Sequence, residues 1–402
     1  MPSPRVIGIA LLVVLCLVGA GFAVFQLTGG HDAQPEEQAP QKSEEELARE
    51  ASIKQAKQIV AEMTLEQKVA QLFVVRPEAI TGVEAATEAG QTTRAAIADY
   101  PVCGLLYSEQ NFIDEKQLVT LLKNTQNYVK DASGVSALMC VEEEGGTYGP
   151  VAASLIVTTE VDGAAKLGMD NEVEHARDAA RQIGEYLRNL GFNTNLAPVA
   201  DAADSAGSDM SDRSFGSEPS KVAALVSAQV DGYQRAGVLC AVKHFPGIGE
   251  AEKDPHNDRL YSHRTKEELM RYELVPFAEA IEADTPIIVV SNMSCLQVGN
   301  GEGDVPSWMS KTIVGDMLRE DLGFEGVAMT DQLDDESMAE ACEPSEQAVR
   351  AIQAGIDIVV CPQDFERAYR GLLKAVEKGE ISESRIDESV MRIVMLKQSL
   401  PD

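Results

Sequence analysis

The stretch Val238–His256, which reads VLCAVKHFPGIGEAEKDPH, decides the fold of this chain. Its first five residues, Val238–Val242, are apolar and partly β-branched, which is typical of a strand buried on both faces. Lys243 and His244 follow at once, before a loop punctuated by proline and glycine. Charged and titratable groups at the carboxyl end of a buried strand are typical of active sites in α/β barrels. The alternative is a solvated loop with incidental charges, but a whole cluster at one strand end favours a site.

Helix and strand patterns alternate along the rest of the chain. The short apolar runs that predict strands are Leu72–Val75, Val102–Tyr107, Ala137–Val141, Asn193–Ala197, Val238–Val242, Pro286–Val290, Gly326–Met329 and Ile356–Val360. The periodic segments that predict helices between them include Glu172–Leu190, Pro219–Ala236, Lys266–Glu282 and Asp364–Lys378. Eight such strands predict an α/β fold, a single closed (β/α)₈ barrel of the TIM type. A doubly wound open sheet is the alternative, although no GxGxxG follows the first strand.

Polar residues gather at the predicted strand ends. The third strand ends in Glu142, Glu143 and Glu144, the fourth runs into Asp201, and the seventh ends in Asp331. In a barrel the carboxyl ends of all strands meet on one face, so these groups are expected to share a pocket with the cluster that follows the fifth strand.

Composition limits the partners. The formal net charge of −31 argues against nucleic acid, because phosphate binding needs clustered Lys and Arg. The seven cysteines show no CxxC or Cys/His spacing, which argues against a metal site and a disulfide framework. Five of them lie in or beside apolar strand-like runs and are expected to be free buried thiols: Cys103, Cys140, Cys240, Cys295 and Cys361.

The amino-terminal segment differs from the rest. Val6–Leu27 holds 22 residues without a charge, long enough to span a bilayer as a helix, and Arg5 precedes it. An uncleaved membrane anchor with the bulk of the chain outside the cytoplasm is the first expectation, and a cleaved signal peptide, which makes the protein secreted, is the alternative. We therefore expect an anchor or signal segment at residues 1–28, an acidic linker at 29–50 that becomes helical near Ser43, and a barrel domain at 51–402.

A set of ordered motifs carries a family resemblance. They are NLAPVAD at Asn195–Asp201, DRSFG at Asp212–Gly216, KHFPG at Lys243–Gly247, GFEG at Gly323–Gly326 before Thr330-Asp331, AGID at Ala354–Asp357, and RIDESV at Arg385–Val390. In this order the chain, from about Met63 to its end, resembles the glycoside hydrolase family 3 β-N-acetylhexosaminidases of the single-barrel type, which trim N-acetylglucosamine from cell-wall fragments.

The resemblance implies a retaining hydrolysis through a covalent glycosyl-aspartate. Asp331 stands at the nucleophile's position, and an aspartate with a pKa of about 3.9 in model peptides is ionised at neutral pH and suited to the attack. A helix N-cap after the seventh strand is the alternative role of Asp331. No metal or organic cofactor is implied.

The same resemblance implies an unusual acid/base. The family's GHGDTxxDSH loop aligns without gaps on Gly247–His256, so that His256 stands for the acid/base and Asp254 for the carboxylate that orients it. Imidazole donates and accepts a proton near neutrality, which suits the role. A solvated loop histidine is the alternative.

The resemblance also implies the sugar-binding residues. Lys243, His244 and Arg213 are expected to hold hydroxyl and N-acetyl groups, and Glu142 stands where the family has an Asp that grips the hydroxyls at the non-reducing end. The partner is therefore a carbohydrate that contains N-acetylglucosamine, and the membrane is approached through the N-terminal segment alone. The oligomeric state does not follow from the sequence.

Several positions depart from the family pattern. Ile248 stands where the family has a His of the loop, and Thr147 stands where it has an Arg. Met293 stands where many members have a His. Pro255 stands where the family has a Ser, and a proline restricts the backbone of the loop. Two functions of different class follow: an exo-β-N-acetylglucosaminidase acting on peptidoglycan or related glycans, and a catalytically weak or inactive glycan-binding relative. A β-glucosidase-like specificity is a third alternative.

Overall fold

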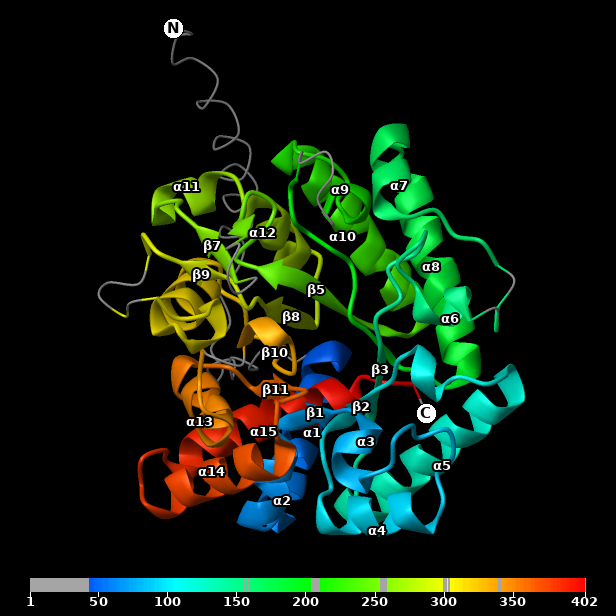
Figure 1. Ribbon diagram of the computed structural model, residues 1–402, viewed down its shortest axis with the longest axis vertical. Helices are drawn as coiled ribbons and strands as arrows, with labels where there is room; N and C mark the ends of the chain where they lie inside the picture. Colours follow the sequence, from blue (N-terminus) through cyan, green and yellow to red (C-terminus); the bar gives the residue numbers. More distant parts are fainter. Residues whose placement is uncertain are drawn as a thin grey trace, which may run out of the picture. The chain divides into compact units, whose positions relative to one another are not determined.

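A computed structural model describes residues 43–154, 156–157, 159–203, 210–253, 259–298, 302, 304–338 and 341–401. Residues Arg49–Asp402 form one compact unit, and a barrel of eight parallel strands lies within it (Figure 1). The barrel strands are β1 (Phe73–Val75), β2 (Gly104–Leu106), β3 (Leu138–Val141), β4 (Thr194–Asn195), β5 (Leu239–Phe245), β8 (Ile287–Val290), β10 (Val327–Gln332) and β11 (Ile358–Val360).

The strands follow one another around the barrel in chain order. Each pairs in parallel with the next, and β11 closes the barrel on β1 with Phe73 opposite Val359. The predicted (β/α)₈ barrel is therefore confirmed, and the doubly wound sheet was the wrong alternative.

The eight predicted strands all exist, but two of them are longer than their apolar runs. β5 continues through Lys243 to Phe245, and β10 continues through Asp331 to Gln332. In both, the register with a neighbouring strand shifts near the carboxyl end. A register shift changes the direction in which the following side chains point. Such shifts are common beside active sites.

Two layers of apolar side chains hold the barrel together. Inside the barrel, buried residues from strands all around it pack on one another, among them Val74, Cys140, Ala241 and Met329. A larger core lies between the strands and the surrounding helices, including Phe73, Val141, Val242 and Ala328. The alternation between the two cores along each strand follows the two-residue period of a β-strand.

The helices wrap the outside of the barrel (Figure 1). They are α1 (Glu44–Glu62), α2 (Leu65–Ala70), α3 (Pro77–Thr81), α4 (Gln91–Asp99), η1 (Glu109–Asn111), α5 (Glu115–Ser133), α6 (Pro150–Ala153), α7 (Ala164–Asp170), α8 (Val173–Leu190), α9 (Met210–Arg213), α10 (Pro219–Ala236), α11 (Lys266–Arg271), α12 (Val275–Glu282), η2 (Ser307–Met309), the π-helix η3 (Thr312–Asp321), η4 (Glu336–Met338), α13 (Pro344–Ala354), α14 (Phe365–Glu377) and α15 (Glu383–Gln398).

The predicted helices are confirmed with one correction. The segment Lys266–Glu282 is not one helix but two, α11 and α12. Pro276 sits in the first turn of α12, where its missing N–H costs no hydrogen bond, whereas inside one continuous helix it would break the ladder. The break leaves Glu273 buried between the two helices, with 2% of the residue exposed.

A small sheet stands outside the barrel. β6 (Glu252–Lys253) pairs antiparallel with β7 (Leu260–Ser262), and β7 pairs in parallel with β9 (Ser294–Cys295). No apolar run predicts it. It ties the loop after β5 to the loop after β8.

Two further expectations meet different outcomes. In the part of the chain that the structure describes, six cysteines are free and buried, as expected. Val6–Leu27 lies outside the described residues. Of the described helices, none has the length and apolar character to cross a membrane.

Candidate active site

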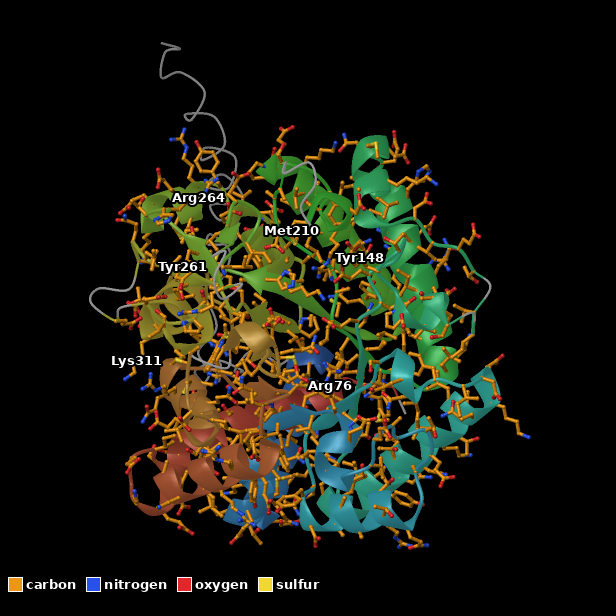
Figure 2. The ribbon with its side chains drawn as sticks, viewed as in Figure 1. Arg76, Tyr148, Met210, Tyr261, Arg264 and Lys311 are labelled. Atoms are coloured by element: carbon orange, nitrogen blue, oxygen red, sulfur yellow. The ribbon has the colours of Figure 1, made fainter. Side chains whose placement is uncertain are left out.

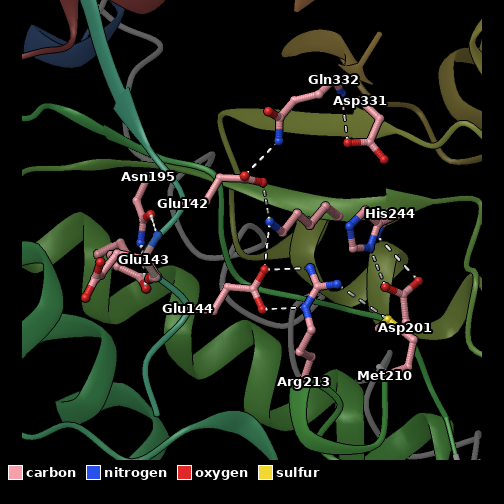
Figure 3. Close-up of polar contacts among 12 residues, drawn as sticks. Glu142, Glu143, Glu144, Asn195, Asp201, Met210, Arg213, His244, Asp331 and Gln332 are labelled. Carbon is pink, nitrogen blue, oxygen red and sulfur yellow. Dashed lines mark hydrogen bonds and ion pairs between the residues drawn. The ribbon is translucent and has the colours of Figure 1, made fainter. Parts of the chain in front are cut away.

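The carboxyl end of β3 supplies carboxylates to the site. Together with Lys243 and Arg213, Glu142 and Glu144 form a charged group of side chains that we call the floor of the site. Glu142 and Glu144 point to the same side and Glu143 to the other, as the two-residue period of an extended chain requires (Figure 3). Glu143 is fully buried, where its carboxylate accepts hydrogen bonds from the backbone of Val151 and from the hydroxyl of Tyr186. It therefore fixes the backbone that presents the other two.

Lys243 lies between Glu142 and Glu144. Its Nζ is 2.9 Å from Oε1 of Glu142 and 2.8 Å from Oε1 of Glu144, and its side chain is 2% exposed. Burial by itself lowers the pKa of Lys243, but the two carboxylates more than offset it and the net pKa is raised. Burial likewise acts to raise the pKa of Glu142, and Lys243 overcomes this and holds the pKa below its ordinary value. All three groups are therefore charged near neutral pH.

Arg213, at the end of α9, grips Glu144 with two nitrogens. Nε and Nη2 donate to the two carboxylate oxygens over 2.8 and 2.7 Å. This bidentate geometry is the strong form of a carboxylate–guanidinium pair. Burial acts to raise the pKa of Glu144, but Lys243 and Arg213 lower it to about 2. The guanidinium of Arg213 also lies over the ring of Tyr148, 5.4 Å from the ring centroid.

His244 is oriented from behind by Asp201. Its Nδ1 is 2.7 Å from Oδ2 of Asp201, and that aspartate is fully buried. Oδ1 of Asp201 also accepts the backbone N–H of Ile248 over 2.8 Å. One carboxylate therefore fixes both the imidazole and the start of the loop after β5.

Asp331 lies within β10 rather than at the start of a helix, so the N-cap alternative was wrong. Its Oδ1 accepts the backbone N–H of Gln332 over 2.9 Å, and Oδ2 has no hydrogen-bond partner among the described residues. Burial raises the pKa of Asp331, with His244 and Lys243 opposing the shift and Glu142 adding to it. The net pKa is above the ordinary value.

Gln332 and Arg76 complete the site, and sequence reasoning missed both. Gln332 Nε2 donates to Oε2 of Glu142 over 2.7 Å, and Arg76 Nη2 donates to Oε1 of Gln332 over 2.6 Å. Arg76 also donates from Nε to Asp334 over 2.6 Å. Arg76 directly follows the first predicted strand, a position that could have marked it. Nothing in the sequence indicates that Arg76 contacts Gln332, which follows the seventh predicted strand.

A cavity of about 550 Å³ opens beside Glu142 and Gln332, toward the ends of β1, β2 and β3. Arg76, Tyr148 and Arg213 also line it. Its volume lies within the range of about 300–1,000 Å³ that is usual for small-molecule sites. No group of three or more His, Cys, Asp or Glu in the described parts of the chain could hold a metal ion.

Comparison with known proteins gives the family. The model of the glycosyl hydrolase family 3 N-terminal domain matches residues 64–396, most of the chain. The chain belongs to glycosyl hydrolase family 3. The predicted resemblance is thus confirmed.

Relatives within family 3 agree with this assignment. The chain is 31% identical over 352 residues to beta-hexosaminidase LpqI of Mycobacterium tuberculosis. The match covers 85% of this chain and 85% of LpqI. It is 28% identical over 328 residues to beta-hexosaminidase A of Pseudoalteromonas piscicida, where the match covers 76% of this chain but about half, 54%, of that protein. A solved family 3 beta-N-acetylglucosaminidase from Paenibacillus sp. str. FPU-7 superposes with a TM-score of 0.77 at 33% identity, over 84% of this chain and 62% of that one.

The structure brings most of the expected site residues of this family 3 barrel together. Glu142, Arg213, Lys243, His244 and Asp331 meet at the carboxyl ends of β3, β5 and β10 and at α9 (Figure 3). Asp254 and His256 lie outside the described residues, in the connection between β6 and β7. Of the departures from the family pattern, Met293 is fully buried, Thr147 lines the cavity and Pro255 lies outside the described residues.

Proposed function

We propose that this family 3 protein is a retaining exo-β-N-acetylhexosaminidase that removes terminal β-linked N-acetylglucosamine. The observation that carries the proposal is a convergence at one end of a family 3 barrel. Asp331, whose Oδ2 accepts no hydrogen bond from the described residues, lies there beside the charged groups of Glu142, Lys243 and Arg213. The names of the relatives, beta-hexosaminidase and beta-N-acetylglucosaminidase, support the same substrate class.

In the proposed first step, Oδ2 of Asp331 attacks the anomeric carbon and the bond to the leaving oxygen breaks. The positive charge that develops on the sugar is stabilised by the carboxylate itself. The leaving oxygen takes a proton from His256, oriented by Asp254. Water then attacks the glycosyl-aspartate, gives its proton to His256 and releases the sugar with its configuration retained.

Floor residues have a binding role in this proposal. Glu142 accepts hydroxyl hydrogen bonds, and Lys243, His244 and Arg213 donate to sugar oxygens and to the N-acetyl carbonyl. Glu142 has the accessible carboxylate, since its side chain is 33% exposed, whereas Glu144 at 10% mainly holds Lys243 and Arg213 in place.

Peptidoglycan fragments are the proposed natural substrate, outside the cytoplasm, with the protein anchored by Val6–Leu27 or secreted if that segment is cleaved. The apolar length of the segment supports this location. Release of N-acetylglucosamine from purified muropeptides would support the substrate class, and cleavage of plain glucosides alone would contradict it.

The deciding experiment uses a chromogenic N-acetyl-β-glucosaminide with the parent, Asp331→Asn and His256→Ala. We expect Asp331→Asn to lose at least about 10³-fold in kcat/KM, because the nucleophile acts as part of a unit. His256→Ala is expected to lose most activity toward a poor leaving group and less toward a good one, since a good leaving group needs little protonation. A parent that binds N-acetylglucosamine saturably without turnover would instead be a glycan-binding relative.

A further inference from the structure

The backbone pairing of β8 with β10 ends just before the reacting carboxylate. Its last pair joins Val290 of β8 to Thr330 of β10, and Asp331 is the next residue. On the other edge of β10 the backbone contact continues further, because the N–H of Leu333 donates to the carbonyl oxygen of Val360 in β11 over 3.1 Å. Beyond Thr330, the β8 edge of β10 is held in a different way.

Asn292, two residues after the end of β8, joins the two strands beyond their last pair. Its Nδ2 donates to the backbone carbonyl oxygen of Gln332 over 2.9 Å. Gln332 in turn gives its backbone N–H to Oδ1 of Asp331 over 2.9 Å. The side-chain amide of Asn292 therefore holds the residue whose backbone holds the proposed nucleophile.

The orientation of the Asn292 amide is set by Trp308 in η2. The indole Nε1 donates to Oδ1 of Asn292 over 3.0 Å. An indole has a donor and no acceptor, so the amide oxygen has to face Trp308 and the amide nitrogen faces Gln332. Trp308 is fully buried and is the single tryptophan of the chain. Burial fixes the ring, and the ring fixes the amide.

η2 is itself bound to the segment that carries Asn292. Ser307 donates its backbone N–H and its hydroxyl to the carbonyl oxygen of Met293, over 2.8 and 2.6 Å. Both Ser307 and Met293 are fully buried. These two hydrogen bonds, with the one from Trp308 to Asn292, hold the indole and the amide at a fixed separation.

These contacts lie on a different side of the barrel from the cavity. β8 is a neighbour of β10, whereas the cavity opens toward the ends of β1, β2 and β3. Figure 2 labels Lys311, which comes two residues after η2 and lies well apart from Arg76 and Tyr148 of the cavity. Asn292 and Trp308 are not among the residues that line the cavity. We therefore expect them to act through the backbone of β10 and not through contact with the sugar.

We propose that Asn292 and Trp308 are positioning residues that hold Asp331 in place for its attack on the anomeric carbon. The inference rests on the proposed function, in which Asp331 is the nucleophile. Asn292 fixes the backbone of Gln332 from the β8 side, and Trp308 fixes Asn292. Catalysis depends on such placement, since a displacement of about 1 Å costs about 10²-fold in rate.

The same contacts bear on the charge state of Asp331. Burial raises its pKa, and the hydrogen bond from the backbone of Gln332 is one of the factors that oppose this rise. The titratable and charged groups that act on its pKa are His244 and Lys243 of β5 and Glu142 after β3. Asn292 and Trp308 carry no charge, so their replacement weakens the hydrogen bond and leaves those groups in place. A weaker bond to the carboxylate raises the pKa of Asp331 further.

The kinetic test uses the full chain and a chromogenic N-acetyl-β-glucosaminide. For Asn292→Ala we expect kcat to fall at least about tenfold while KM changes less than about threefold, because the floor of the site is untouched. The acidic limb of the kcat/KM profile should move about half a unit to higher pH, since Asp331 has to be ionised to attack. A loss confined to KM, or a limb that does not move, would overturn the proposal.

Two further variants test whether the residues act as one chain. Asn292→Asp keeps an acceptor for Trp308 but has no N–H to give to Gln332, so it should lose at least as much activity as Asn292→Ala. Trp308→Phe removes only the donor to Asn292 and should lower kcat about threefold. Combined with Asn292→Ala it should add nothing, because the second link is already lost. Full additivity of the two losses would contradict the chain.

The matched control is Asn193→Ala. Asn193 also joins backbone segments with its amide, since Oδ1 accepts from the N–H of Met139 and Nδ2 donates to the carbonyl oxygen of Ala137, each over 2.8 Å. It stands at the amino end of β4, away from the carboxyl ends that carry the site. We expect lower stability with an unmoved acidic limb. An equal shift in both variants would mean that general loosening of the barrel is the cause.

A measurement without turnover separates failure of this inference from failure of the proposed function. With tryptophan labelled by ¹⁵N at the indole, the full chain gives one indole cross-peak, from Trp308. We expect this peak to shift with pH at an acidic inflection that is absent in Asp331→Asn and in Asn292→Ala. If the parent hydrolyses no N-acetyl-β-glucosaminide, the hydrolase proposal fails and this titration still decides the chain. An inflection that persists in Asp331→Asn, or none in the parent, would overturn the inference.

Discussion

Gln332 donates its side-chain amide to Glu142 over 2.7 Å, although 190 residues separate the two in the chain. The orientation of that amide is fixed by Arg76, which has only donors and therefore faces the amide oxygen of Gln332. The same residue gives its backbone N–H to Asp331. Gln332 thus positions both the proposed nucleophile and the carboxylate that is proposed to bind the sugar.

Replacement of Gln332 by Glu should shift the pH profile. The new carboxylate would lie against Glu142, and two like charges at hydrogen-bond distance raise each other's pKa. We expect the acidic limb of the kcat/KM profile to move to higher pH by about one unit, with at least about tenfold lower activity near the old limb. Gln332→Met should lower kcat/KM without moving the limb.

The control for this pH shift is Gln91→Glu, which adds the same charge at an exposed position on α4. A similar shift in that variant would mean that the effect of Gln332→Glu is a general field effect rather than contact with Glu142.

Loss of Lys243 should destabilise the protein. Without its ammonium group, Glu142 and Glu144 face each other without the cation that now lies within 2.9 and 2.8 Å of them. Breaking such a buried pair costs about 3–5 kcal/mol. Urea unfolding of Lys243→Met at pH 7 measures this loss. Lys166→Met, at an ion pair whose lysine is 71% exposed, should change the free energy of unfolding by less than about 1 kcal/mol.

The pKa of Glu144 predicts a loss of stability in acid. Because Lys243 and Arg213 overcome burial and lower its pKa to about 2 in the folded state, the unfolded chain takes up the proton first as pH falls below the ordinary 4.5. Its contribution, about 3 kcal/mol, is present above pH 4.5 and is lost between there and pH 2. Glu144→Gln should therefore flatten the free energy of unfolding against pH in this window. If the slope of the free energy of unfolding against pH is unchanged, other carboxylates cause the loss of stability in acid.

Glu273 predicts the opposite dependence. Burial raises its pKa to about 7, with Arg264 opposing the shift, so the folded state holds a proton that the unfolded chain has already released. This favours the folded state below pH 4.5, and the advantage disappears as pH rises through 7. We expect Glu273→Gln to gain up to about 3 kcal/mol relative to the parent between pH 5 and pH 8.

Thermal unfolding at the two pH values checks the prediction for Glu273. The matched control, Glu279→Gln, changes an exposed residue of α12 and should show no pH-dependent difference. A gain that is equal at pH 5 and pH 8 would contradict the raised pKa.

The barrel could be predicted because its determinants are local. Each strand is a short apolar run, and the eight runs recur between amphipathic helices, which is enough to fix the parallel order. The break between α11 and α12 also has a local cause, Pro276. The sequence did not predict the break because the helical period of apolar residues continues from one helix into the other. The small β6–β7–β9 sheet has strands of two or three residues, too short to carry a period.

The sequence by itself determined the family, the eight strands and the polar groups that follow them. Lys243, His244 and Asp331 stand next to apolar runs, so their place at the barrel mouth follows from chain order. Only the tertiary structure decided how these groups pair, which placed Arg76 on Gln332, Gln332 on Glu142, and Lys243 between two carboxylates. Such pairs join residues from different strands, and their hydrogen bonds depend on barrel closure and strand register, which leave no periodic trace in the chain.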